Sequence, residues 1–176
     1  LHLPIQSGSD SILKKMNRKY NVSSYLKIIE KLRKAREDIA FSSDFIVGYP
    51  GETDKDFEKT ISVIEKVKYS NAYSFVYSAR PGTPSSILKN KINKLLCDER
   101  LYTIQNVIKK QQKEYNNRFL GKKISVLFEK KGKYQNQYIG RSIYNQSVFI
   151  NNKKNIIGTI ANVNINRITN FALSAD

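Results

Sequence analysis

The sequence is poor in the residues that build disulfides and metal sites. Its 176 residues include one cysteine, one histidine, one methionine and no tryptophan. A lone cysteine excludes an internal disulfide framework and any multi-cysteine metal site made by this chain alone. It also favours, weakly, a cytoplasmic location, because disulfides are rare in that compartment.

Long apolar runs are missing as well. No stretch approaches the ~20 apolar residues that a membrane helix needs, so we expect neither a membrane span nor a membrane partner. The first residues show no basic region followed by an apolar one, so we expect no signal peptide among them. They also lack an initiator methionine and open on a strand-like segment, which leads us to expect a piece of a longer protein.

Acidic residues are scarce relative to basic ones. There are 15 Asp and Glu against 31 Lys and Arg, a net charge of +16. Residues 117–176 carry ten basic and two acidic side chains together with seven Phe or Tyr. This mixture of cations and aromatic rings favours a polyanionic partner such as nucleic acid. The alternative is drift toward lysine, isoleucine and asparagine in an A/T-rich genome, with the lysines as solvated decoration.

Apolar and amphipathic segments alternate over residues 1–96. Their spacing predicts three strands and two longer helices, at residues 1–6, 41–47 and 72–77 and at residues 25–35 and 53–67. Thr53, with Asp56 three residues later, predicts a capping box at the start of the second helix. The order β-α-β-α-β predicts a parallel sheet covered by helices, and three strands are too few to close a barrel. We therefore expect an α/β fold that is a partial (β/α) barrel.

The period of the pattern changes in the C-terminal third. A long polar helix, which we place at residues 97–116, looks like a connector. Beyond it, apolar residues recur at every second position and predict five short strands, at residues 124–129, 138–144, 148–150, 157–166 and 169–173. Residues 117–176 should therefore form a small antiparallel OB-like β-barrel.

Six cations of this barrel are candidates for RNA binding, namely Lys130, Lys131, Lys133, Arg141, Lys153 and Lys154. The five lysines fall in predicted turns, at residues 130–133 and 151–155, where they would reach phosphates without disturbing the strands. The arginine lies on a predicted strand between two tyrosines, so its guanidinium would stack as well as pair.

Polar and glycine-rich segments follow each strand predicted in residues 1–96. They occupy residues 6–9, 48–53 and 78–84. Ligands of parallel α/β sheets bind at the carboxyl ends of the strands, and glycines there let the backbone approach a ligand. Each segment alone is explained as well by turn formation, but their conjunction is more specific.

Four segments carry a family resemblance: Leu3-Pro4-Ile5-Gln6-Ser7-Gly8-Ser9, Met16-Asn17-Arg18-Lys19-Tyr20, Ser43–Thr53 and Tyr73–Pro84. Together they closely resemble the radical-SAM methylthiotransferase family, and the basic barrel resembles the TRAM RNA-binding domain of those enzymes. The resemblance covers essentially the whole chain. It is closest to the tRNA branch that acts on N6-isopentenyladenosine beside the anticodon. The threonylcarbamoyl-adenosine branch and the ribosomal-protein branch are the alternatives.

The resemblance implies an enzyme with two [4Fe–4S] clusters. One, held by a Cys-x3-Cys-x2-Cys motif, would cleave S-adenosylmethionine to a radical that takes hydrogen from the target carbon, and the other would supply sulfur for a methylthio group. Both cysteine sets are absent here, so this chain would ligate neither cluster, and the missing half would lie upstream. The implied partners are S-adenosylmethionine and the anticodon stem-loop of tRNA. The alternative from another class is an RNA-binding module separated from its catalytic half.

By this resemblance, the S-adenosylmethionine site would include Gln6, Ser7, Asp44, Ile46, Gly48 and Arg80. Gln6 and Ser7 would bond ribose or amino-acid groups, and Ile46 would face adenine. Asp44 and Arg80 would contact the methionyl group or the substrate; the alternative is a structural ion pair between them. The family's Gly-x-Ile-x-Gly-x-x-Glu pattern is only partly met, because Asp44 replaces its first glycine and Glu52 falls one residue late.

Three further positions stand apart from these motifs. We expect His2 to pack rather than catalyse, and Cys97 to be an inert thiol. Arg18 and Lys19 follow the first predicted turn, where they either end a solvated helix or contact a phosphate.

Overall fold

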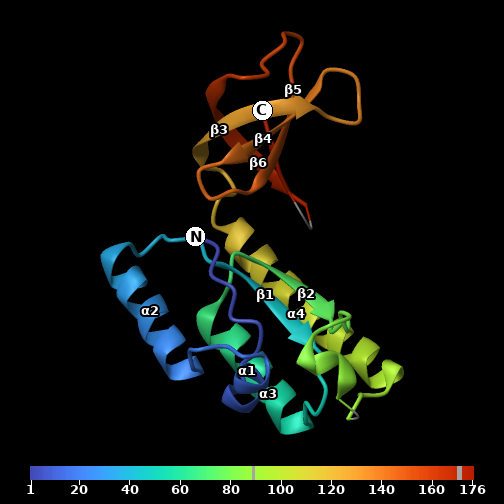
Figure 1. The fold of residues 1–176 in the computed structure, drawn as a ribbon. Helices are drawn as coiled ribbons and strands as arrows, with labels where there is room; N and C mark the ends of the chain where they lie inside the picture. The colour runs from blue at the N-terminus through green and yellow to red at the C-terminus, as the bar shows by residue number, and fades with distance from the viewer. Residues whose placement is uncertain (89, 170–171) are drawn as a thin grey trace. The chain divides into compact units, whose positions relative to one another are not determined.

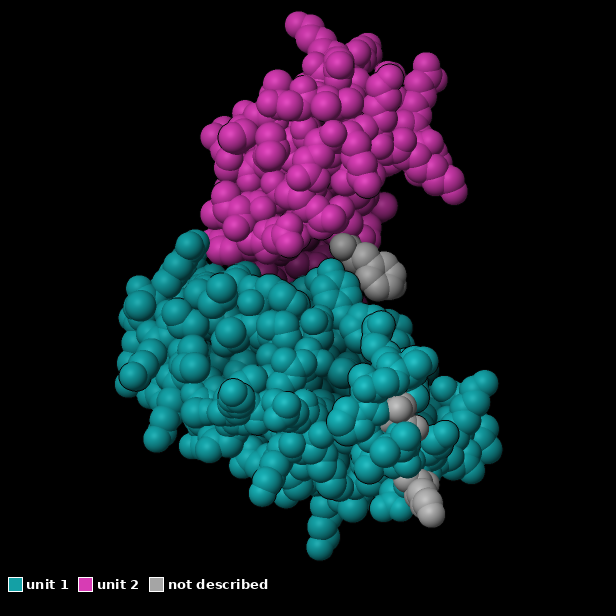
Figure 2. Space-filling model, in the orientation of Figure 1, with its two compact units in different colours: residues 1–111 teal, residues 112–176 magenta. Residues whose placement is uncertain are grey.

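The computed structural model describes residues 1–88, 90–169 and 172–176. It divides into two compact units, residues 1–111 (unit 1) and residues 112–176 (unit 2), which Figure 2 colours separately. The division falls inside the last helix, within the segment expected to be a connector. None of the described helices is long and apolar enough to cross a membrane.

Unit 1 follows the predicted alternation of helices and strands (Figure 1). Its elements are α1 (Asp10–Lys15), α2 (Val22–Ala35), β1 (Ser42–Val47), α3 (Asp54–Val67), β2 (Asn71–Val76), a short 3₁₀ helix (Pro84–Ile87) and α4 (Lys94–Asn117). The predicted capping box is confirmed, since Thr53 and Asp56 each accept a backbone N–H from the other. The strands β1 and β2 are parallel, as predicted, and pair in register from Ser42 with Asn71 to Val47 with Val76.

The first predicted strand is only partly formed. Residues 1–6 run beside β1 but pair with it at two isolated positions, His2 with Ser42 and Gln6 with Phe45. The first segment advances four residues between these two pairs, whereas β1 advances three. The first segment therefore has one extra residue between the pairs. Pro4 has no N–H to give to a ladder, and the next N–H, of Ile5, bonds a side-chain hydroxyl of β1 instead. The prediction of a regular strand is therefore wrong, and proline is the physical reason.

The two faces of the β1–β2 sheet differ. On one face, Phe45 and Val47 are fully buried against apolar residues of α2, α3 and α4. On the other face, Tyr73 and Phe75 of β2 are 53% and 55% exposed beside Asp44 and Ile46 of β1. A sheet that buries one face under helices and leaves large rings exposed on the other has a surface available for a ligand or for further chain.

Unit 2 is a closed five-stranded barrel in the order β3-β4-β5-β7-β6. The strands are β3 (Lys123–Lys131), β4 (Gln137–Ser142), β5 (Ser147–Asn151), β6 (Ile160–Ile168) and β7 (Ala172–Ala175). The predicted barrel of five strands is confirmed, although residues 170–171 of the fifth predicted strand lie outside the described residues. The barrel is not wholly antiparallel, because β5 and β7 pair in parallel. The β5–β7 contact joins strands that are not consecutive, so no hairpin turn fixes their relative direction.

Inward-facing side chains fill the barrel. Val126, Phe128, Val148, Ile165 and Leu173 are all nearly or fully buried. A barrel this small is packed by its own side chains and leaves no interior channel for a ligand. Binding by unit 2 therefore has to use its outer surface.

Candidate functional site

A pocket of about 450 Å³ lies on the less covered face of the sheet, where β1 and β2 end. Its lining includes four of the six residues predicted to bind S-adenosylmethionine, namely Gln6, Asp44, Ile46 and Arg80. The fold brings these residues together from three chain segments, each of which follows or belongs to a parallel strand. The volume lies within the usual range for small-molecule sites, about 300–1,000 Å³.

Strand periodicity and one strained residue shape this pocket. Asp44 and Ile46 alternate along β1 and so project to the same face, beside Tyr73 and Phe75 of β2. Gln6 has φ +75, a conformation that residues other than glycine rarely adopt. Backbone hydrogen bonds hold it there: its N–H donates to Asp44 (3.0 Å) and its C=O accepts from Ile46 (2.9 Å). The side-chain amide is thereby fixed beside the pocket.

The structural ion pair between Asp44 and Arg80, the alternative to ligand contacts, is not found among the described residues. The Asp44 carboxylate instead lies 3.4 Å from Nε2 of His2. The other ring nitrogen, Nδ1, lies 2.9 Å from the hydroxyl of Ser42. His2 therefore makes polar contacts at a half-exposed position instead of packing in the core. The pocket presents one carboxylate and one guanidinium, which suits a ligand that carries both charges.

Ser7 and Gly48 lie outside this pocket. The Ser7 hydroxyl is fully buried, 3.4 Å from the hydroxyl of Thr60 in α3. Gly48 lines a smaller pocket of about 250 Å³ together with Cys97. It has φ +74, and a Cβ added there would meet the Cys97 Sγ at 2.5 Å. Both residues have clear structural roles at these positions.

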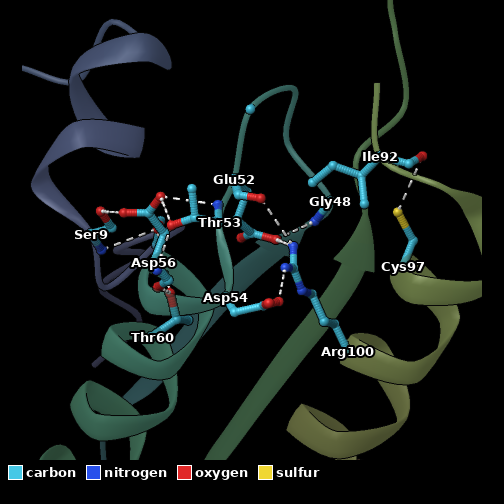
Figure 3. Close-up of polar contacts among 12 residues, drawn as sticks. Ser9, Gly48, Glu52, Thr53, Asp54, Asp56, Thr60, Ile92, Cys97 and Arg100 are labelled. Carbon is cyan, nitrogen blue, oxygen red and sulfur yellow. Dashed lines mark hydrogen bonds and ion pairs between the residues drawn. The ribbon is translucent and has the colours of Figure 1, made fainter. Parts of the chain in front are cut away.

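A buried ion network, absent from the sequence-based prediction, fixes the loop after β1 (Figure 3). The Arg100 guanidinium of α4 donates to the Glu52 carboxylate (2.8 Å) and to Asp54 (2.6 Å). Glu52 also accepts from the N–H of Gly48 at 2.8 Å. Burial raises the pKa of Glu52, against the opposing effects of these two donors. The network ties the pocket-forming loop to α4.

A second network joins the loop after residues 1–6 to the start of α3 (Figure 3). The Asp56 carboxylate accepts hydrogen bonds from Ser9 (2.5 Å), Ser11 (2.9 Å) and both the N–H and the hydroxyl of Thr53. Burial acts to raise the pKa of Asp56, but these hydrogen bonds outweigh it and hold the pKa well below its usual range. The carboxylate therefore serves as a fixed anchor between two loops.

The lone thiol is unsuited to iron–sulfur ligation. Cys97 is buried, and burial raises the pKa of its thiol, which disfavours the thiolate that a cluster needs. Among the described residues there is also no group of three or more His, Cys, Asp or Glu that could hold a metal ion. This chain's residues do not fit an iron–sulfur cluster.

The six candidate cations of unit 2 are all exposed. Lys153 and Lys154 lie in the β5–β6 loop, as predicted, and Lys133 follows β3 with its ammonium 5.9 Å from the ring centre of Tyr134. The placement of Lys130 and Lys131 in a turn is wrong. Strand β3 continues through them after a bulge near Phe128, and they pair with Ile139 and Tyr138.

Arg141 lies on β4, where its Nε is 3.9 Å from the Glu129 carboxylate. That weak surface pair leaves the guanidinium exposed, and one of its N–H groups donates to the C=O of Asn145. The cationic character of the barrel surface is largely uncompensated.

Comparison with known proteins agrees with these two units. Residues 1–64 match the family model of the radical SAM superfamily, and residues 117–176 match that of the TRAM domain. A tRNA-2-methylthio-N(6)-dimethylallyladenosine synthase of Ehrlichia ruminantium is 56% identical over 151 residues, covering 86% of this chain and 34% of the relative. The synthase of the same name from Agrobacterium fabrum is 52% identical over 165 residues, covering 94% of this chain and 36% of the relative. The chain thus spans about a third of the length of the curated relatives it matches. By these matches, residues 1–64 are similar to the radical SAM superfamily, residues 117–176 are similar to the TRAM domain, and the chain is similar to about a third of these tRNA methylthiotransferases.

Proposed function

We propose that this chain is part of an enzyme that adds a methylthio group to C2 of N6-isopentenyladenosine next to the anticodon of tRNA. The names of its relatives support this substrate, and the two units supply complementary parts. The observation that carries the proposal is the pocket where β1 and β2 end, which gathers Gln6, Asp44, Ile46 and Arg80.

The chemistry of that pocket suits part of an S-adenosylmethionine molecule. Ile46 and the exposed ring of Phe75 offer an apolar surface to adenine, and the Gln6 amide offers a donor and an acceptor to ribose hydroxyls. The ammonium and carboxylate of the methionyl group match Asp44 and Arg80. When bound, S-adenosylmethionine would supply the hydrogen-abstracting chemistry of the radical-SAM family. The chain's own residues bind and orient it.

Neither iron–sulfur cluster would be held by this chain. The family uses cysteine thiolates, and the only thiol here is buried and has a raised pKa. We therefore assign both clusters to a part of the protein outside residues 1–176. The less covered face of the β1–β2 sheet supports this, because further strands at the edges of a partial radical-SAM barrel would curve around that face and enclose it.

Unit 2 would hold the tRNA through its outer surface. Its interior is filled by side chains, and its exposed cations outnumber its acidic groups by ten to two over residues 117–176. Phosphate contacts supply most of the affinity of such surfaces and make it depend on salt. The anticodon stem-loop is the RNA element implied by the position of the modified adenosine.

The test uses the complete protein encoded by the reading frame that contains this sequence. It is expressed in a bacterial strain that lacks its own methylthiotransferase. The nucleosides of the tRNA are then separated by liquid chromatography and identified by mass spectrometry. We expect the 2-methylthio derivative of N6-isopentenyladenosine. A methylthio group on threonylcarbamoyl-adenosine would assign the other tRNA branch, and unmodified tRNA that is nevertheless bound would favour an RNA-binding module.

A matched set of variants tests the pocket in the same protein. Asp44→Asn and Arg80→Gln should each weaken S-adenosylmethionine binding by about 10-fold to 100-fold, the value of one charged hydrogen bond of about 1.5–3 kcal/mol. Lys55→Gln, an exposed position on α3, is the control and should leave affinity unchanged. Isothermal titration calorimetry measures the affinities. Equal affinity in all four proteins would contradict the assignment of this pocket.

A further inference from the structure

A second pocket of about 450 Å³ adjoins the first and has no assigned role. The two pockets share Ile46, Tyr77, Thr83 and Ser85 in their linings. The remaining lining residues of the second pocket are Lys15, Met16, Asn17, Arg18, Tyr49 and Pro84. A ligand in the second pocket would therefore lie directly beside a ligand in the first.

The chemistry of the second pocket differs from that of the first. Among the described residues, its lining holds two cations, Lys15 and Arg18, and no acidic residue. Two tyrosine rings, Tyr49 and Tyr77, also line it and meet edge to face with their centres 5.0 Å apart. Cations beside aromatic faces are the combination that binds a phosphate together with the base that it carries.

The cations are held by the fold rather than left on a mobile surface. Asn17, two residues beyond α1, has φ +57, and the next N–H, of Arg18, donates back to the C=O of Leu13 at 2.9 Å. The Lys15 ammonium donates to the C=O of Gly51 at 3.2 Å, and the Tyr49 hydroxyl donates to the C=O of Lys15 at 2.8 Å. These bonds fix the end of α1 against the loop after β1. Two of the three ammonium N–H groups stay available for a ligand.

One polar atom at this pocket is left unsatisfied by the protein. The Tyr77 hydroxyl is buried, and within residues 1–88, 90–169 and 172–176 it has no hydrogen-bond partner. Buried hydroxyls nearly always have one, and Tyr77 lines the second pocket, the first pocket and the smaller pocket beside Gly48. This observation is independent of the two cations.

We propose that the second pocket binds a nucleotide of the RNA substrate, with Lys15 and Arg18 on its phosphate and the half-buried Tyr77 ring against its base. The proposal rests on the proposed function, in which an RNA is modified next to the first pocket. It gives Arg18 the phosphate contact, where the alternative was a solvated helix end. It also places an RNA contact in unit 1, separate from the cations of unit 2.

The first experiment measures RNA binding by the 176-residue chain with a fluorescently labelled anticodon stem-loop, at several salt concentrations. The double variant Lys15→Gln/Arg18→Gln should bind about tenfold or more weakly. Its plot of log affinity against log salt should be shallower by about 0.7 for each phosphate that the variant no longer neutralises. The control Lys14→Gln/Lys19→Gln removes two exposed charges from the same helix end but outside the pocket lining, and should weaken binding less than threefold.

Two results of this experiment would overturn the proposal. If both double variants weaken binding equally, the effect is that of general positive charge and not of a site. If the pocket double variant binds as the wild type does, the pocket takes no phosphate. Circular dichroism of each variant checks that the helices are intact, and Arg18→Lys, which keeps the charge, should retain at least half of the binding free energy that Arg18→Gln removes.

A second measurement locates the ligand with a smaller probe. In ¹H–¹⁵N NMR of the chain, adenosine 5′-monophosphate should shift the amide signals of Arg18 and Tyr77, and adenosine alone should bind several-fold more weakly. Equal binding of the two probes would refute the phosphate contact. These outcomes are separable from the proposed function: the complete protein can methylthiolate tRNA with this pocket unused, and the pocket can bind nucleotide in a protein that modifies nothing.

Discussion

Gly48 permits a sharp test of how the loop after β1 is built. The substitution Gly48→Ala places a methyl group at φ +74, which costs about 1–2 kcal/mol for a residue with a Cβ. The new Cβ would also meet the Cys97 Sγ at 2.5 Å, well inside the ordinary contact distance of about 3.5–4.0 Å. Overpacking of this kind adds about 1–3 kcal/mol. The sum, about 2–5 kcal/mol, is a large part of the stability of a typical domain, about 5–15 kcal/mol.

A double-mutant cycle separates the two costs. Cys97→Ala removes the sulfur, after which the nearest atom to the new methyl is the Cys97 Cβ position at 3.4 Å, an ordinary contact. The single change Cys97→Ala should cost about 1 kcal/mol for the lost buried volume. In the double variant the overpacking cost disappears, so the two substitutions should couple favourably by about 1–3 kcal/mol.

Urea unfolding followed by far-ultraviolet circular dichroism measures the cycle, because unit 1 holds α1 to α3 and most of α4. The control is Gly82→Ala, where φ is +80 but no atom of the described residues lies within 4 Å of the added methyl. It should show the conformational cost alone. Additivity of Gly48→Ala and Cys97→Ala within about 0.5 kcal/mol would refute the steric reasoning. In that case, the glycine at position 48 would be explained instead by the close approach of a ligand to the backbone.

Three further predictions concern charge. Hydrogen bonding lowers the pKa of Asp56 in the folded state. The carboxylate therefore stabilises the fold above its unfolded pKa of about 3.9, and this stabilisation is lost as pH falls through the lower folded-state pKa. Asp56→Asn should remove this loss of stability in acid. The midpoint of urea unfolding, measured at a series of pH values, tests this prediction. If the variant loses stability in acid as the wild type does, the prediction is wrong. Arg100→Met leaves the buried Glu52 carboxylate without its cation and should cost about 3–5 kcal/mol at neutral pH, less at pH values where Glu52 is protonated. The same urea assay measures the loss of unfolding free energy. A loss that does not depend on pH would contradict the role given to the Glu52 carboxylate. Lys153→Glu with Lys154→Glu should flatten the salt dependence of RNA binding, which we expect to have a slope of roughly −2 to −4 for about 3–5 phosphates. If these lysines contact only solvent and no phosphate, the slope should stay unchanged.

Local sequence signals predicted the elements whose stability is local. The helix α3 begins where Thr53 and Asp56 form a capping box, and β1 and β2 occur where apolar runs end in glycine or proline. The pocket residues came from a resemblance and not from periodicity, since nothing in the pattern alone joins Gln6 to Arg80. Their meeting in one pocket follows from parallel pairing, which puts the carboxyl ends of neighbouring strands at one edge.

Features that depend on distant residues escaped prediction. The partner of Glu52 is Arg100, 48 residues away on a polar helix whose other charges are exposed. No local pattern marks that arginine as buried. The parallel β5–β7 pair and the continuation of β3 through Lys130 likewise depend on barrel closure, which is decided by all five strands at once. Pro4 was a readable signal: a proline inside a predicted strand argues against a regular ladder.

The two adjoining pockets differ in charge, so each should favour a ligand of a different charge. The first holds a carboxylate, Asp44, and a guanidinium, Arg80, so a purely anionic group would be repelled by one as it is attracted by the other. The second holds Lys15 and Arg18 without an acidic group, so a phosphate gains there and a zwitterion gains little. A zwitterionic cofactor and an anionic polymer would thus occupy neighbouring sites without competing. Because Tyr77 lines both pockets, each ligand would lie beside the other's site, and any effect of one ligand on the affinity of the other must be reciprocal.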